Sequence, residues 1–304
     1  MSASAGAVAS TLARLRNIAD ASELSFNDVL QRYVTERFLA RLATLPDAET
    51  VLLKGALMLG VWGVPRARPT MDIDLLRRGP ADRNSLLDFV ARCAAVPNAG
   101  DVVEFDAKSL VAEAITEDAA YSGTRLRLIA RLGNVRQTVQ VDFGVGDAVF
   151  PGPLRIEFPV LLGGQPIRLD AYPVEASIAE KFHAIVVREL RNSRMKDFYD
   201  IWILSRNCSF SREVLRGAIE STFHRRETAL PAELLSALTE AFFADATHVR
   251  QWRAFTNRIG AVELANSLPQ VATDIAAFLM PVVLIAPDSE GPASWRAGGP
   301  WERV

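Results

Sequence analysis

The stretch LLKGALMLGVWGVPRARPTMDIDLL, residues 52–76, decides how this chain folds and which chemistry it can carry. It ends in a short apolar run that holds two carboxylates, Asp72 and Asp74, on alternate positions. Side chains of a strand alternate between its faces, so the two carboxylates are predicted to project together while Ile73 turns into the core. Carboxylates so close repel each other, and burial strengthens the repulsion. Since Mg²⁺ prefers one or two carboxylates together with substrate phosphates, the pair indicates a divalent-metal site.

A small-residue turn, Gly55-Ala56, lies upstream of the carboxylates. We expect it to open a helix over about 55–62, whose N-terminal amides can hold phosphate. Each feature alone is a weak signal, because D-x-D also occurs at ordinary polar strand ends and small residues are common where a helix begins. Together, the strand, turn, helix, loop and second strand have the spacing of a nucleotidyltransferase motif. The combination indicates metal-assisted nucleotide chemistry.

The composition is that of an ordinary globular protein. The chain has 304 residues, 49% apolar and 23% charged, which is enough for one large or two modest domains. A net charge of −2 gives no global signal for nucleic acid, so such a partner would need a local basic patch. The cysteines, Cys93 and Cys208, are far apart in apolar surroundings and are interpreted as core thiols of a reducing cytoplasm. We find no secretory signal pattern and no apolar run long enough for a membrane span, so a cytoplasmic location away from the membrane is expected.

The chain is predicted to contain four zones. Residues 1–46 form N-terminal helices packed on a catalytic domain at 47–173, and a helical domain at 174–284 closes the cleft. Residues 285–304 form an irregular tail, of which Trp295 or Trp301 docks on the body of the protein. Strands are predicted at 51–53, 71–76, 101–106, 123–132, 135–143, 154–158 and 167–171. Helices are predicted at 26–45 (capped by Ser25), 55–62, 82–96, 175–190, 195–207, 211–224, 231–244, 247–258 and 268–280. Gly133-Asn134 is a strong hairpin signal between two of the strands. The fold class is therefore α/β (α+β), a mixed sheet with flanking helices followed by an all-helical domain.

A third carboxylate, Asp142, lies within the apolar strand sequence VQVDFG, where aspartate is rare. It is either an aspartate paired with a nearby arginine, or a third metal ligand or a group that orients or deprotonates an attacking hydroxyl. The sequence leaves both interpretations open.

Basic and acidic residues gather in two later helices. Lys181 lies on a helix with an apolar opposite face and is suited to neutralise the phosphates of a metal-bound triphosphate. Asp197 and Asp200 are three residues apart, hence on one helix face, next to Lys196. Taken alone, this second group is more typical of a solvated helix start with acidic residues favoured by the helix dipole.

Two residues of the loop before the carboxylate pair are further candidates. Arg68 is placed to contact phosphate or RNA, although a loop arginine is usually just solvated. Thr70, two residues before Asp72, is expected on the same side of the strand.

The order of these motifs, LKGA, R-x-T-x-D-I-D, YSGTRLRLIARLGN, VQVDFGVGD, YPVEASIAEKF and NSRMKDFYDIW, resembles the AbiEii/AbiGii nucleotidyltransferase-like toxins, which include the MenT-type toxins. The likeness runs from about residue 50 to 205. It implies a nucleotidyltransferase fold followed by a helical domain, with a cleft between them, and a toxin neutralised by an antitoxin encoded nearby. Some relatives transfer nucleotides to the 3′ end of tRNA, which blocks aminoacylation.

The resemblance also implies roles for individual residues. Asp72 and Asp74 match the metal pair, for which Mg²⁺ or Mn²⁺ is expected, and the strand aspartate Asp142 is expected to join them as a catalytic residue and metal ligand. Gly55, Ala56, Lys181 and Lys196 match nucleotide-binding positions, and the full expected nucleotide-binding set is Lys54, Gly55, Ala56, Arg68, Thr70, Lys181 and Lys196. Lys181, Asp197 and Asp200 are also expected to be catalytic, and Thr70 matches a position that a kinase antitoxin phosphorylates in some relatives. Ala56 departs from the usual Gly-Gly or Gly-Ser turn, so no hydroxyl can reach phosphate there.

The expected function is therefore a toxin that transfers NMP from an NTP to an RNA acceptor, at the tRNA 3′ end, with release of pyrophosphate. One alternative is a nucleotidyltransferase of the antibiotic-modifying kind, which acts on a small cationic molecule. The other is a nucleotide-binding module without turnover. An RNA enzyme needs a basic groove and the antibiotic-modifying kind an acidic pocket, and the sequence shows arginines at 188, 191, 194, 225 and 226.

Overall fold

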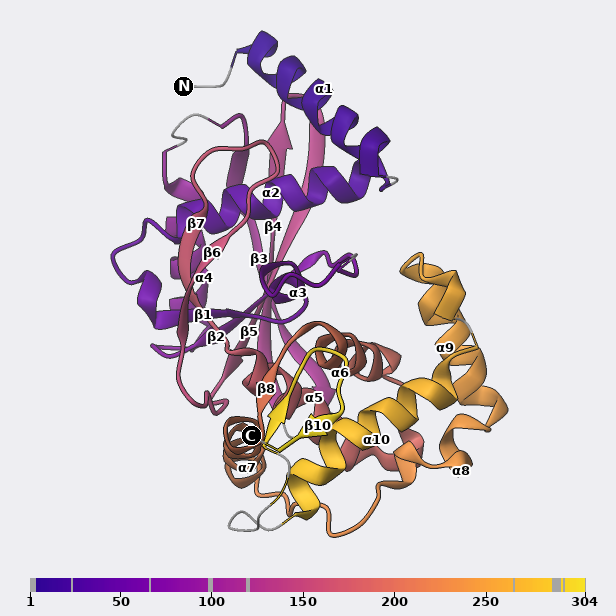
Figure 1. Ribbon diagram of the computed structural model, residues 1–304. Coiled ribbons are helices and arrows are strands. Elements are labelled where there is room, and N and C mark those ends of the chain that lie inside the picture. Colours follow the sequence, from indigo (N-terminus) through magenta and orange to yellow (C-terminus); the bar gives the residue numbers. More distant parts are fainter. Residues whose placement is uncertain are drawn as a thin grey trace. The chain divides into compact units, whose positions relative to one another are not determined.

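The chain divides into two compact units (Figure 1). A computed structural model describes residues 4–303 except 23, 66, 98–100, 119–120, 265, 286–290 and 292, and leaves the side chains of 116–118 and 121–122 undescribed. Unit 1 comprises Met1–Val61, Pro69–Gly146 and Leu154–Ala171. Unit 2 comprises Trp62–Arg68, Asp147–Pro153 and Tyr172–Val304.

Unit 1 is built on a mixed seven-stranded sheet of order β3-β4-β5-β2-β1-β7-β6. Its elements in chain order are α1 (Ala5–Ser22), α2 (Phe26–Leu42), η1 (Ala48–Thr50), β1 (Val51–Lys54), α3 (Leu57–Val61), β2 (Asp72–Arg77), α4 (Arg83–Ala95), β3 (Glu104–Asp118), β4 (Tyr121–Leu132), β5 (Val135–Val145), β6 (Leu154–Phe158) and β7 (Ile167–Ala171). The pairs β2–β5 and β1–β7 are parallel, and the other neighbours are antiparallel. The predicted mixed sheet with flanking helices is confirmed.

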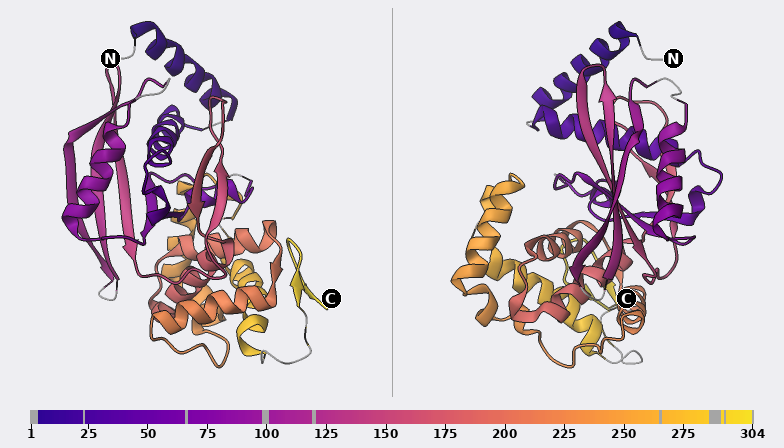
Figure 2. Two further views of the ribbon diagram at one scale, coloured as in Figure 1. Left: turned by 90° about the vertical axis from the view of Figure 1, so that its left-hand side faces the viewer. Right: turned by 180° about the vertical axis from the view of Figure 1, so that it is seen from behind.

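Local sequence signals account for two of these elements. The Ser25 side chain accepts a hydrogen bond from the backbone of Asp28 and so caps α2 where predicted. β4 and β5 form the predicted hairpin, in which Leu132 pairs with Val135 around Gly133 and Asn134. Gly133 has φ +57°, the left-handed backbone that a two-residue hairpin requires and glycine adopts at little cost. Figure 2 shows the long strands β3, β4 and β5 side by side.

Two helices of unit 1 cover the same face of the sheet. The Phe38 ring of α2 packs edge-on against Phe105 of β3 at 5.7 Å, and the Phe89 ring of α4 packs against Phe143 of β5 at 6.2 Å. Both sheet residues pair with even-numbered residues of β4 and therefore share one face. Paired side chains on the opposite face are polar and partly exposed, and this second face carries the candidate site.

Two predictions in unit 1 need correction. The strand expected at 101–106 is β3, which begins at Glu104 and continues to Asp118, because pairing with β4 extends it past an irregularity between Asp106 and Val111. The helix expected over 55–62 has only five residues, Leu57–Val61, since Gly55 and Ala56 form a turn with Gly55 at φ +73°. A helix this short provides little dipole, so phosphate binding there would depend on turn amides.

Unit 2 is mainly helical. Its elements are α5 (Val174–Arg188), η2 (Glu189–Arg191), α6 (Met195–Asn207), β8 (Phe210–Ser211), α7 (Arg212–Arg225), η3 (Ser236–Leu238), α8 (Glu240–Phe243), α9 (Ala246–Arg258), η4 (Val262–Leu264), α10 (Leu268–Leu284), β9 (Ser294–Trp295) and β10 (Trp301–Glu302). The helix predicted at 231–244 is wrong in extent, because Thr239 has an extended backbone that separates η3 from α8. The helical character predicted for this part of the chain is confirmed, and β8, β9 and β10 add a small antiparallel sheet to it.

The C-terminal tail docks through its tryptophans, as expected. The indole of Trp295 is 6% exposed and donates a 2.6 Å hydrogen bond to the carbonyl of Ser205. The Trp301 indole donates to the carbonyl of Phe278 at 2.8 Å and stacks on that ring. The tail therefore adds an aromatic cluster to unit 2 instead of remaining irregular over its described part.

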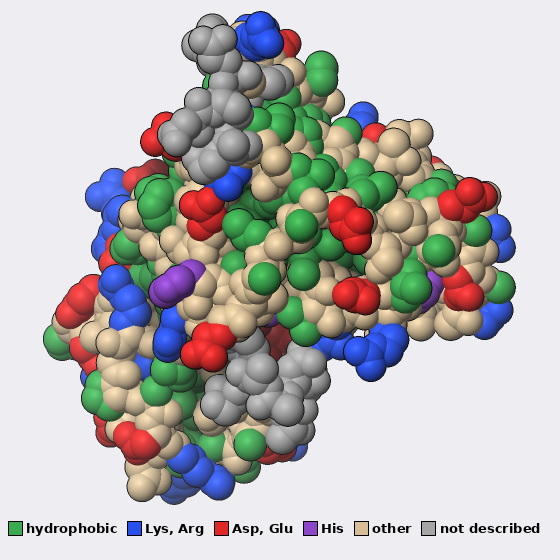
Figure 3. Space-filling model, turned by 90° about the horizontal axis from the view of Figure 1, so that it is seen from below, with side chains coloured by type: hydrophobic (Ala, Val, Ile, Leu, Met, Phe, Trp, Pro, Cys, Tyr) green, Lys and Arg blue, Asp and Glu red, His purple; other side chains and the backbone are tan. Residues whose placement is uncertain are grey.

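The surface carries charges of both signs. On the face drawn in Figure 3 the described basic and acidic side chains are interspersed, in keeping with the net charge of −2. Among the described helices, none has the length and apolar character that crossing a bilayer requires.

Candidate functional site

The carboxylate pair lies on β2, on the partly exposed face of the unit 1 sheet. Asp72 and Asp74 flank Ile73, which is 0% exposed, so the alternation predicted from sequence is confirmed. Asp74 is the cross-strand neighbour of Lys54 at the end of β1. The turn that follows β1 comes so close that a β-carbon on Gly55 would lie 1.9 Å from Asp74 Oδ2. Two features identified separately in the sequence are therefore in direct contact.

Two cross-strand rows extend from the pair across the sheet. Asp72 pairs with Gln140 of β5, which pairs with Arg127 of β4. The second row runs from Asp74 to Asp142, Arg125 and Glu113 in the same order of strands, with β3 last. Paired residues of a sheet share a face, so the acidic pair and this polar group lie together.

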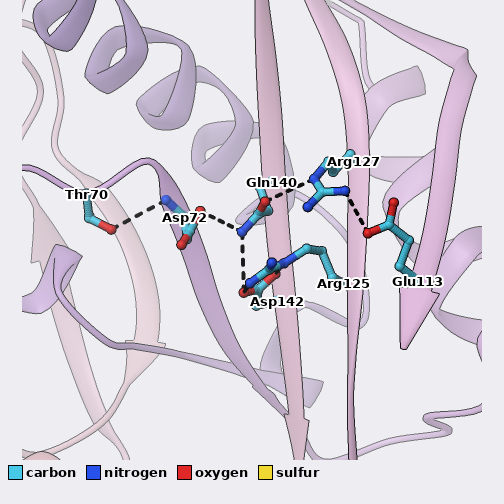
Figure 4. A network of polar contacts seen from close by, with 7 residues as sticks. All are labelled: Thr70, Asp72, Glu113, Arg125, Arg127, Gln140 and Asp142. Carbon is cyan, nitrogen blue, oxygen red and sulfur yellow. Dashed lines mark hydrogen bonds and ion pairs between the residues drawn. The ribbon is translucent and has the colours of Figure 1, made fainter. Parts of the chain in front are cut away.

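Hydrogen bonds join the two rows into one network (Figure 4). Arg125 donates from Nε and Nη2 to both carboxylate oxygens of Asp142, at 2.9 and 2.7 Å. Gln140 Nε2 donates to Asp72 Oδ1 at 2.6 Å and lies 3.5 Å from Asp142 Oδ2. The backbone amide of Asp72 donates to the Thr70 hydroxyl at 3.4 Å, which places Thr70 beside the pair.

Asp142 forms an ion pair with Arg125 in this structure. Of the two interpretations left open by the sequence, pairing with an arginine is the one seen, because Arg125 binds the carboxylate in a bidentate ion pair. Within the part of the chain that the structure describes, no three histidine, cysteine or acidic side chains are grouped so that they could hold a metal ion. The three-carboxylate ligand set is thus not assembled in this structure, and participation of Asp142 stays a prediction.

The donor set of β2 nevertheless suits a divalent cation. Asp72 and Asp74 supply two carboxylates on one side of a strand, and the Asp74 carboxylate contacts the Gly55 backbone. Mg²⁺ and similar hard cations are bound in this way by one or two carboxylates, with the remaining positions taken by water and substrate phosphates. The two aspartates are therefore the residues that would hold the metal.

The sequence reasoning overlooked three residues of this site: Gln140, Arg125 and Arg127. A signal for them was available. The Gly133-Asn134 turn fixes the hairpin register, and counting outward from it places Arg125 opposite Asp142 and Arg127 opposite Gln140. Alternation in the strand then puts all four side chains on the face of the aspartates.

A second polar cluster lies in unit 2. The Lys181 ammonium is 2.7 Å from Asp200 Oδ2 and 3.7 Å from Asp197 Oδ1. Arg68 donates from Nε and Nη2 to the two oxygens of Asp200, each at 2.8 Å. Arg194 Nε donates to Asp197 Oδ2 at 2.6 Å. Four predicted site residues, Lys181, Asp197, Asp200 and Arg68, are thus brought together, whereas the Lys196 side chain is exposed.

The acidic members of this cluster are buried. Asp197 is 1% and Asp200 0% exposed, so a solvated helix start, which the sequence alone favoured, is not what forms. Burial by itself would raise the pKa of Asp200, but the charge of Lys181 and the hydrogen bonds of Arg68 outweigh it and lower the pKa to about 2. Asp200 is therefore ionised at neutral pH and fixes the positions of two cations.

The predicted site residues accordingly fall into two clusters. Unit 1 holds Lys54, Gly55, Ala56, Thr70, Asp72, Asp74 and Asp142, and unit 2 holds Arg68, Lys181, Lys196, Asp197 and Asp200. Convergence of Asp72 and Asp74 with Lys181 around one nucleotide stays a prediction.

Two solved Helicobacter pylori structures are similar: JHP933 (16% identity, TM-score 0.49, covering 84% of this chain and 95% of that one) and a candidate nucleotidyltransferase (15% identity, TM-score 0.48, covering 85% and 96%). At this level of similarity neither structure bears on the function of this chain. No curated protein matches it.

The family comparison is decisive. The family described as "Nucleotidyl transferase AbiEii toxin, Type IV TA system" matches residues 37–277, which is more than three quarters of the chain and includes both clusters. The chain therefore belongs to the AbiEii family of nucleotidyltransferase toxins of type IV toxin–antitoxin systems.

Proposed function

We propose that this protein is a Mg²⁺-dependent toxin that transfers NMP from an NTP to an RNA acceptor, the 3′ end of tRNA, with release of pyrophosphate. The observation that carries the proposal is the contact between the Asp74 carboxylate and the Gly55 turn, with Asp72 on the same side of β2. This arrangement sets two carboxylates for a cation against the Gly55 turn, so that a triphosphate bound through the cation would lie beside the turn.

The chain's own residues would act mainly by positioning and by balancing charge. Asp72 and Asp74 would hold the divalent cation, which when bound neutralises charge on the phosphates. Gly55 has no side chain, so the Asp74 carboxylate lies directly against the turn backbone, and phosphates held by a cation at Asp74 would lie next to the turn. Little covalent chemistry falls to the protein in phosphoryl and nucleotidyl transfer, so orientation and electrostatics dominate.

The unit 2 cluster would contribute positive charge. Lys181 and Arg68 are held by Asp200, and Arg194 by Asp197, so the cations are fixed in position before a substrate arrives. Fixed cations stabilise charge that develops on a leaving pyrophosphate without having to reorganise. We propose this role for Lys181 and Arg68, with exposed Lys196 as a further phosphate contact.

The direct test is transfer of label. Purified protein is incubated with each of the four α-³²P-labelled NTPs, Mg²⁺ and total tRNA. We expect one or more of the nucleotides to label tRNA. Loss of one carboxylate ligand should remove several kcal/mol of transition-state stabilisation, which lowers the rate of transfer by a factor of about 10² or more. Asp72→Asn and Asp74→Asn are therefore expected to be nearly inactive. Asp106→Asn is the matched control, because Asp106 is an aspartate of the same sheet, paired at its edge with Arg131.

Growth provides an independent readout. Expression without antitoxin should arrest growth for the wild type and for Asp106→Asn, and not for Asp72→Ala. An Asp72→Ala protein that still arrests growth would defeat the catalytic explanation. Label incorporated into a small cationic molecule instead of tRNA would favour the antibiotic-type enzyme, and NTP binding without pyrophosphate release would favour a non-catalytic binding module.

The antitoxin is a partner implied by the family. We propose that it is encoded beside this gene and acts in the cytoplasm. Co-expression with the adjacent open reading frame should restore growth, and continued arrest would contradict this assignment.

A further inference from the structure

The Gln140 side chain is held at both ends of its amide group. Its Nε2 donates to Asp72 Oδ1 at 2.6 Å, and its Oε1 accepts from Arg127 Nε at 3.0 Å. Arg127 is in turn held by Glu113, through an Nη1–Oε2 contact of 2.7 Å. These residues come from four neighbouring strands, β2 to β5, and share one face of the sheet (Figure 4).

The chemistry of the neighbours fixes the orientation of this amide. A guanidinium can only donate and a carboxylate can only accept. Turning the amide over would place Oε1 against the Asp72 carboxylate and the NH₂ group against the Arg127 guanidinium, which loses both hydrogen bonds and brings partial charges of the amide against ions of the same sign. The hydrogen bond from Arg127 therefore fixes the orientation of the Gln140 amide, with its NH₂ group toward the carboxylates.

A neutral donor at this position affects the charge of the aspartates differently from an arginine. Arg125 forms a bidentate ion pair with Asp142 and so compensates its charge. Gln140 orients Asp72 through a hydrogen bond and, being neutral, does not itself neutralise the negative charge of that carboxylate. The same NH₂ group lies between Asp72 and Asp142, 3.5 Å from the latter, and reduces the repulsion between them.

We propose that Gln140 is a positioning residue that aims Asp72 at the divalent cation, and that Arg127 acts through it by fixing its amide. This inference rests on the proposed function, since it assigns a role relative to the Asp72–Asp74 pair. It adds residues that touch neither the cation nor the nucleotide, and it predicts that Arg127 affects metal binding only while Gln140 is present. Partners that orient metal ligands commonly change metal affinity or activity by about 10–100-fold.

Mn²⁺ binding to the full-length protein, followed by electron paramagnetic resonance without nucleotide, tests this proposal. Gln140→Leu should bind Mn²⁺ about 10-fold or more weakly than the wild type. In the transfer assay its loss of rate should shrink as Mg²⁺ is raised, because Asp72 is still present, whereas Asp72→Asn should not recover. The matched control is Gln137→Leu, a glutamine of the same strand that hydrogen-bonds Asn27 on the opposite face.

A double-mutant cycle separates positioning from packing. Arg127→Leu should weaken Mn²⁺ binding by a smaller factor, and should add nothing in the Gln140→Leu background, because its effect passes through the amide. The Arg127 side chain is 34% exposed, so Arg127→Leu is expected to fold. Its Mn²⁺ affinity therefore tests the proposal even if Gln140→Leu is unstable.

The outcomes separate this inference from the proposed function. Mn²⁺ affinity of folded Gln140→Leu within twofold of the wild type would overturn the inference, as would an additive cycle or wild-type affinity in Arg127→Leu. If Asp72→Asn loses Mn²⁺ while Gln140→Leu retains it, only the positioning role fails. If the wild type and Asp72→Asn bind Mn²⁺ equally, the assignment of Asp72 and Asp74 as metal ligands is wrong, and both the positioning role and the proposed function are contradicted.

Discussion

The Asp74 carboxylate and the Gly55 backbone are in direct contact, so close that a β-carbon on Gly55 would lie 1.9 Å from Asp74 Oδ2. Gly55 also has φ +73°, a conformation that other residues adopt only with strain. Two independent requirements thus demand glycine at this position. The contact ties the end of β1 to the carboxylates of β2.

Gly55→Ala is therefore expected to lose nucleotidyl transfer by about 10² or more, since a misplacement of about 1 Å can have that effect. It should also lower the free energy of unfolding by at least about 1 kcal/mol through left-handed strain. Gly60→Ala is the matched control, because nothing lies within 4 Å of its added carbon and Gly60 is in helix α3. Transfer assays and urea denaturation of both variants check this. Full activity of Gly55→Ala would show that the turn is not close to the reacting groups.

The Asp200 ion pairs predict a pH-dependent loss of stability. Asp200→Asn leaves Lys181 and Arg68 without their buried carboxylate, and should lower the free energy of unfolding by roughly 3 kcal/mol at pH 7. Because the pKa of Asp200 is lowered from 3.8 to about 2, its contribution is present above pH 4 and is lost as the pH falls toward 2.

Denaturation curves between pH 2.5 and 7 test the direction in which the Asp200 contribution to stability changes with pH. The difference between wild type and Asp200→Asn should narrow as the solution is acidified. Glu220→Gln, which removes a half-exposed ion pair with Arg216 in the same unit, should change stability by less than about 0.5 kcal/mol. A difference that stays constant with pH would contradict the ionised, doubly paired state.

Glu36 of α2 predicts the opposite pH dependence. It is 0% exposed, and burial raises its pKa to about 7 despite the hydrogen bond from the Leu161 amide and the charges of Arg32 and Arg37. The folded state then holds a proton that the unfolded state releases near pH 4.5, so stability falls as pH rises from 4.5 to about 7 and is level above it.

Glu36→Gln should remove this dependence. The variant is expected to match the wild type near pH 5 and to exceed it at pH 8, by about 1.4 kcal/mol for each unit of pKa shift at most. Chemical denaturation at the two pH values provides the measurement, with Glu157→Gln at an exposed ion pair of the same unit as control. Lower stability of Glu36→Gln at pH 8 would mean that the arginine contacts outweigh burial.

The docked tail predicts a packing effect. Trp295→Ala removes a 6% exposed indole that contacts Phe278 and donates to the Ser205 carbonyl, and should destabilise unit 2 by roughly 3–5 kcal/mol. Trp301→Ala should have a smaller effect because that indole is more exposed. Thermal unfolding of the two variants compares them. Equal and negligible changes would show that the tail is not part of the folded unit.

Several elements could be predicted because their signals are local. Alternation around Ile73 fixes the faces of Asp72 and Asp74, Gly133 fixes the hairpin turn, and Ser25 caps the helix that follows it. Helix α6 has the predicted bounds 195–207, since its apolar spacing is clear. Where the local signal was ambiguous the prediction was less accurate: strand β3 runs to Asp118 because β4 pairs with it, which its own sequence does not reveal.

The sequence by itself therefore determined which residues alternate, where turns occur and which carboxylates share a strand, because these depend on neighbours within a few positions. Only the tertiary structure decided what each charged group meets. Asp142 meets Arg125 across a hairpin, Gln140 meets Asp72 across a parallel pair, and Asp200 is buried because Arg68, far away along the chain, compensates it. The free energy of a buried charge depends on partners that the fold brings together, and spacing along the chain does not contain that information.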